Sequence, residues 1–154
     1  VGLRWVRGND PDGVVASFHP KEPYRVEPAK CRHPLVSRLI PMDLPQDEIY
    51  TALEQTRPMW VLMNTTISSG TFPQCTESTS PWGGRVINFL PGHAATVTRD
   101  PALIANVRTL IDSLLACPAN HRRKQPPARI ASGRGRFSCL FRWNRLTGRG
   151  RAAA

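Results

Sequence analysis

The chain has 154 residues, a length that suits one domain of ordinary size. Its formal net charge is +10, but residues 1–120 carry 11 basic and 11 acidic side chains, and the excess lies in residues 121–154. This distribution argues against nucleic-acid binding by the body of the chain. Because the sequence has no apolar run of about 18 residues and no secretory signal peptide, we expect no membrane span.

The cysteines indicate a reducing compartment. Cys31, Cys75, Cys117 and Cys139 are widely spaced and form no Cys-x-x-Cys pair. This pattern favours reduced thiols in a cytoplasmic protein over a zinc knuckle or a thioredoxin-like motif. The chain begins at Val1, which indicates that its start was removed or that it is a fragment.

Several short elements are predicted in the first half of the chain. We expect strands at 3–6 and 24–26, and a proline-punctuated irregular region from 32 to beyond Pro45. The apolar run 59–63 predicts a strand covered on both faces, as in a parallel sheet. Two further segments are a loop at 8–13 and a loop or hairpin arm at 67–81.

A strand followed by a helix is the clearest pattern in the second half. Residues 85–90 predict a strand, Asp100 is a suitable N-cap, and Pro101 fits the first helical position. Pro118 ends the helix. We expect the apolar face of this helix to pack on the sheet, with Asn106, Arg108, Asp112 and Ser113 on the opposite face. The apolar face comprises Leu103, Ile104, Val107, Leu110, Ile111, Leu114 and Leu115.

His93 stands in the turn Pro91-Gly92-His93 between this strand and the helix. Ligands of open α/β sheets bind beyond the carboxyl ends of strands. A neutral imidazole there can act as an acid, a base or a metal ligand near neutral pH. The alternative is that His93 only caps the turn.

Three stretches, in order, carry a resemblance to a known family. They are His33-Pro34-Leu35-Val36, which follows Leu-Arg-Trp-Val; Asp47-Glu48-Ile49-Tyr50; and Gly84 to His93, Gly-Arg-Val-Ile-Asn-Phe-Leu-Pro-Gly-His. The chain thereby resembles the C-terminal half of ThuA-like (trehalose-utilisation) proteins. That resemblance implies an α/β fold: a partial flavodoxin-like, class I glutamine amidotransferase-like open sheet with flanking helices, over 1–118, with the family's N-terminal half missing. Ala94 stands where the family pattern has Glu.

The resemblance also implies a function and a site. It implies a role in the metabolism of trehalose or a related glycoside, with a small carbohydrate as ligand. His93 is then an acid/base or metal ligand, and Glu48 and Tyr50 orient the substrate. The alternatives are a solvated turn in which Tyr50 packs, and a non-catalytic binding or subunit-interface module, including a homo-oligomer.

Other candidate residues carry weaker signals. Cys31 and His33 form a Cys-x-His pair that could hold a divalent metal if His19, His93 or Cys75 completed the set, or His33 fixes the turn before Pro34. Nothing near Cys75 indicates the base that a nucleophile needs. We expect Trp60 and Trp82 to pack rather than to stack on a sugar.

The basic segment 119–154 has no sustained period and is expected to be a disordered tail. Its Gly-Arg runs could bind nucleic-acid phosphates without sequence preference. We favour a disordered extension over that function.

Overall fold

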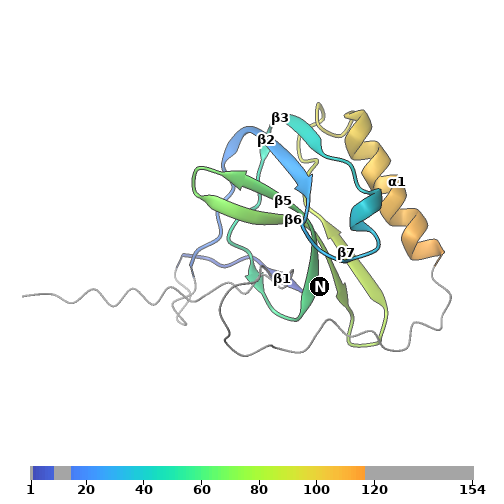
Figure 1. Cartoon of the computed structure of the whole chain (residues 1–154). Coiled ribbons are helices and arrows are strands. Elements are labelled where there is room, and N and C mark those ends of the chain that lie inside the picture. The colour runs from blue at the N-terminus through green and yellow to red at the C-terminus, as the bar shows by residue number, and fades with distance from the viewer. Residues whose placement is uncertain (1, 9–14, 117–154) are drawn as a thin grey trace, which may run out of the picture.

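A computed structural model describes residues 2–8 and 15–116 of the chain (Figure 1). The expected tail at 119–154 and most of the loop at 8–13 lie outside the described residues. The described chain combines β strands with one α helix, so its mixed composition of helix and sheet is confirmed. No helix in this described part is long and apolar enough to cross a membrane.

Five strands form the main sheet in the order β3-β2-β5-β6-β7. Their bounds are Lys21–Pro28 for β2, Met42–Glu48 for β3, Met59–Ile67 for β5, Gly70–Thr79 for β6 and Arg85–Phe89 for β7. A separate small sheet pairs β1, Leu3–Arg4, with β4, Glu54–Gln55. The short strand at the start of the chain and the strand predicted at 85–90 are thus confirmed.

The parallel pairing expected around residues 59–63 is wrong, because every strand pairing in the described residues is antiparallel. The chain turns back through residues 68–69, and Ile67 pairs with Gly70 in a tight hairpin. A hairpin places consecutive strands side by side in opposite directions. The hairpin alternative for 67–81 is therefore confirmed. The apolar run on β5 reflects a central strand covered on both faces, whichever way its neighbours run.

The irregular region ends earlier than the prolines predict. A single 3-10 turn, Val36–Arg38, precedes β3, and β3 includes Pro45 and ends at Glu48. β3 is an edge strand of the sheet, where a residue without an N–H costs no ladder hydrogen bond on its free side. Glu48 therefore lies at the end of a strand that pairs with β2, although the register of this pairing shifts between Leu44 and Asp47.

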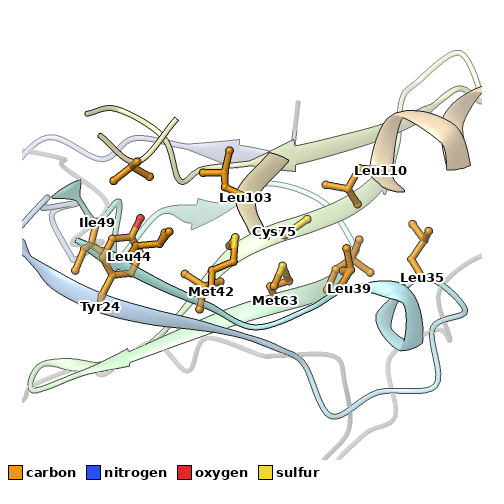
Figure 2. Close-up of a cluster of buried hydrophobic side chains, with 13 residues drawn as sticks. Tyr24, Leu35, Leu39, Met42, Leu44, Ile49, Met63, Cys75, Leu103 and Leu110 are labelled. Carbon is orange, nitrogen blue, oxygen red and sulfur yellow. The ribbon is translucent and has the colours of Figure 1, made fainter. Parts of the chain in front are cut away.

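The helix α1, Pro101–Leu115, begins as predicted. The Asp100 side chain accepts a hydrogen bond from the Leu103 N–H at 2.9 Å, and Pro101 is the first helical residue. Figure 1 shows α1 lying beside the sheet on the side of β7. In Figure 2 the side chains of Leu103 and Leu110 reach from α1 toward the sheet residues Cys75 and Met63, within one hydrophobic core.

The rotation of α1 differs from the predicted one. Asn106 is 1% exposed and Ser113 is buried, whereas Ile111, Leu114 and Leu115 are exposed. Asn106 is tolerated inside because its amide bonds both backbone groups of Ile40, accepting from the N–H at 2.9 Å and donating to the carbonyl at 2.8 Å. A specific polar contact thus overrides the apolar pattern of the helix.

Candidate functional site

The turn at residues 91–94 is held by one buried carboxylate. Asp47, on β3, is 3% exposed. Its Oδ2 accepts from the N–H groups of Gly92 at 3.1 Å and His93 at 3.2 Å, and its Oδ1 accepts from Ala94 at 2.7 Å. Gly92 has φ +113°, in the region that favours glycine. The position of His93 is therefore fixed by its backbone, through Asp47.

Glu48, the next residue, faces the imidazole of this turn. Its Oε2 lies 3.6 Å from Nδ1 of His93 and 4.0 Å from Nδ1 of His19. Its Oε1 lies 2.9 Å from Nζ of Lys21. Lys21 and Glu48 are direct cross-strand partners at the ends of β2 and β3. The pairing of β2 with β3 and the turn held by Asp47 thus bring together one carboxylate, one ammonium group and two imidazoles.

The charges around Glu48 favour its ionised form. The hydrogen bond from Lys21 lowers the pKa of Glu48, and the nearby His93 and His19 act in the same direction. The same pair raises the pKa of Lys21. At neutral pH the site therefore holds a carboxylate–ammonium pair, with the carboxylate also beside an imidazole.

Tyr50 joins this cluster through aromatic rings. Its ring centroid lies 6.3 Å from that of His19 and 6.0 Å from that of Trp5, the latter in an edge-to-face arrangement. Trp5 and His19 are 5.5 Å apart. The structure thus brings the three expected site residues into one neighbourhood, His93 and Glu48 directly and Tyr50 by way of His19.

This arrangement suits acid–base chemistry at an open surface. The His93 side chain is 56% exposed, whereas that of Glu48 is 14% exposed. Nδ1 of His93 faces the carboxylate, so Nε2 is the nitrogen left for a ligand. A separation of 3.6 Å is longer than a hydrogen bond, but catalytic contacts of this kind shorten when substrate binds. Once shortened, the carboxylate would fix the tautomer of the imidazole.

His33 lies in a different cluster. Its Nε2 is 3.7 Å from Oε2 of Glu77, its Nδ1 accepts from the Leu35 N–H at 3.3 Å, and its ring packs on Trp60. Burial lowers the pKa of His33, although Glu77 opposes this effect. These contacts support the interpretation that His33 fixes the turn before Pro34.

The metal hypothesis lacks a ligand set in the described part of the chain. No group of three or more His, Cys, Asp and Glu side chains there is arranged to hold a metal ion. His33 and His93 contact different carboxylates, and the Cys31 thiol donates to the Val61 carbonyl at 3.5 Å. Cys31 and His33 are therefore engaged in local structure instead.

The remaining candidates, Cys75, Trp60 and Trp82, differ in how deeply they are buried. Cys75 is fully buried, and burial raises the pKa of its thiol to about 12, which suits a core residue rather than a nucleophile. Trp60 packs against the core as expected. Trp82 is 90% exposed, so the expectation that it packs is wrong.

Four residues of the site were not assigned to it from the sequence. Asp47 stands within a stretch that carries the family resemblance, but its backbone contacts lie 45–47 residues away along the chain. His19 and Lys21 enter through the pairing of β2 with β3, and Trp5 enters through its ring contacts. The only sequence signal was the turn composition around Gly92, which calls for a nearby acceptor of free N–H groups.

Comparison with models of protein families, with curated proteins and with solved structures gave no match.

Proposed function

We propose that this chain is a ThuA-like protein that acts in the cytoplasm on trehalose or a related glycoside. In this proposal His93 is the acid or base, and Glu48 and Tyr50 orient the substrate. The observation that carries it is the contact between Glu48 and His93, 3.6 Å apart. Two of the stretches on which the resemblance rests, 47–50 and 84–93, meet at this point.

The fold and compartment in the proposal follow the same resemblance. The order of β7, the His93 turn and the capped helix α1 agrees with the order that the resemblance implies. The antiparallel pairing of the described strands differs from the parallel sheet of a flavodoxin-like fold, so the proposal rests on the site and not on the sheet. A cytoplasmic location is supported by Cys31 and Cys75, which are both free thiols.

The chemistry would run through Nε2 of His93. With Nδ1–H held by the ionised Glu48, Nε2 carries the lone pair and can accept a proton from a water molecule as the water oxygen bonds to the anomeric carbon. As the glycosidic C–O bond breaks, the imidazolium, stabilised by the same carboxylate, returns that proton to the departing sugar oxygen. Lys21 keeps Glu48 ionised throughout this cycle.

The test is to incubate the full chain with trehalose or methyl α-glucoside and to measure the conversion of each sugar by NMR. We expect His93→Ala and Glu48→Gln to lower the rate about 100-fold or more, the usual contribution of a positioned acid or base. His33→Gln is the matched control, because His33 contacts Glu77 and not Glu48. Equal rates for wild type and His93→Ala would end the catalytic proposal.

A non-catalytic sugar-binding module is the second candidate. It is favoured by Ala94, which stands where the family pattern has Glu. The contact of Ala94 with Asp47 is made by its backbone N–H, and its side chain supplies no carboxylate. This candidate predicts that wild type binds the sugar, converts none of it, and retains binding in His93→Ala. Measurable turnover by wild type would exclude it.

A further inference from the structure

Trp5 is displayed at the surface by a fixed segment of backbone. Its side chain lies directly after β1, and the residue is 40% exposed. The next residue, Val6, is 1% exposed and exchanges two hydrogen bonds with Ser17, one through the backbone and one through the hydroxyl, both at 2.9 Å. The Ser17 hydroxyl in turn donates to the Ala52 carbonyl at 3.0 Å. The indole is therefore exposed on a rigid support.

Two further rings hold the indole in place. His19 lies 5.5 Å from it with the planes tilted by 42°, and Tyr50 meets it edge to face at 79°. The three rings come from separate parts of the sequence, so only the folded chain assembles them. An exposed large aromatic surface of this kind, with its orientation fixed, is suited to bind a flat apolar face.

His19 connects this aromatic cluster to the polar groups. Its Nδ1 lies 4.0 Å from Oε2 of Glu48, and the same oxygen lies 3.6 Å from Nδ1 of His93. One open surface thus has an aromatic side and a hydrogen-bonding side. The ammonium of Lys21 is already paired with Glu48 at 2.9 Å, which favours a neutral ligand over an anionic one.

From this geometry we infer that Trp5 is the stacking platform for a pyranose ring of a neutral sugar, with Glu48 and His93 facing the hydroxyl edge of that ring. A pyranose presents C–H groups on its flat face and hydroxyls around its rim, which matches the two sides of the surface. Trp5 is a binding and positioning residue in this inference, which rests on the proposed carbohydrate function.

The experiment is calorimetric titration of the full chain with trehalose, with glucose 6-phosphate as the anionic comparison. We expect Trp5→Ala to weaken trehalose binding about three- to tenfold, the range of an aromatic contact, and Trp5→Phe to weaken it less. Trp82→Ala is the matched control, because Trp82 is 90% exposed and lies in the turn before β7. We expect this control to bind trehalose as wild type does.

A second measurement uses the unmodified chain and is independent of any loss of folding in Trp5→Ala. The indole N–H resonance of Trp5, assigned by its absence in Trp5→Phe, should shift on addition of trehalose while that of Trp82 stays in place. Trehalose binding without this shift, and unaltered in Trp5→Ala, would overturn the stacking role and leave the proposed function standing. Tighter binding of glucose 6-phosphate would overturn the neutral-sugar class. Absence of sugar binding by wild type would overturn both proposals.

Discussion

Asp47 offers the sharpest test of how the candidate site is held together. Its two carboxylate oxygens accept three backbone hydrogen bonds, two on Oδ2 and one on Oδ1. In Asp47→Asn a single carbonyl oxygen can keep at most the two bonds to Gly92 and His93. The amide NH2 then faces the N–H of Ala94, which places donor against donor.

The expected cost follows from these contacts. A hydrogen bond to a charged group contributes about 1.5–3 kcal/mol, so the loss of one bond and the weakening of two should destabilise Asp47→Asn by about 2–4 kcal/mol. Asp47→Ala loses all three bonds and should cost at least as much. These are large fractions of the roughly 5–15 kcal/mol that stabilises an ordinary domain.

Urea unfolding followed by tryptophan fluorescence measures this cost. Asp43→Asn is the matched control: it lies on the same strand, its side chain is 75% exposed, and its partner is the surface residue Arg25. We expect the control to change stability by less than about 0.5 kcal/mol. If Asp47→Asn unfolds at the same urea concentration as Asp43→Asn, the carboxylate does not hold the turn, and the argument for a fixed His93 is refuted.

Four further predictions concern three side chains. Asn106→Ala removes both hydrogen bonds to Ile40 and should destabilise the chain by about 2–4 kcal/mol in urea unfolding. A change below about 0.5 kcal/mol would show that these two hydrogen bonds do not stabilise the chain. The Tyr24 hydroxyl is buried and has no hydrogen-bond partner among the residues that the structure describes, so Tyr24→Phe should stabilise the chain by about 1 kcal/mol at pH 7. Lower stability of this variant would show that the hydroxyl is bonded. Burial and the nearby Asp47 raise the pKa of the Tyr24 phenol above its ordinary value of 10.0. Above about pH 10 the phenol therefore ionises only in the unfolded chain, so the stability of the wild type should fall as the pH rises. This fall should be smaller in Tyr24→Phe. In Lys21→Met the pKa of Glu48 should rise toward its ordinary value, and an unchanged carboxyl titration by NMR would show that Lys21 does not control it.

The local elements of the fold could be predicted because their signals are local. Asp100 and Pro101 mark the start of α1, and the run at 85–89 becomes β7. Their side chains act within a few residues of their own position, through capping and alternation. The direction of the strands could not be predicted in this way, because it depends on how β5 and β6 are connected and not on the composition of either strand.

The rotation of α1 and the membership of the site depend on long-range partners. Asn106 is inside because its amide pairs with both backbone groups of Ile40, a contact that the helical period cannot predict. Glu48 and His93 could be singled out from the resemblance, but Lys21 joins them only through the register of β2 on β3. A change of one residue in that register would move Lys21 to the opposite face and separate it from Glu48.

Asp47 and Glu48 show how adjacent residues with almost the same chemistry take different roles. Asp47 is buried, and three backbone N–H groups compensate for the loss of water around its carboxylate. Glu48 lies nearer the surface, compensated by the side chain of Lys21, and its second oxygen faces two imidazoles. Because backbone donors keep their position when a ligand binds and side-chain donors can move, Asp47 is suited to fix the turn and Glu48 to respond to a substrate. The same division explains why the Asp47 variants should act mainly on stability and Glu48→Gln mainly on activity.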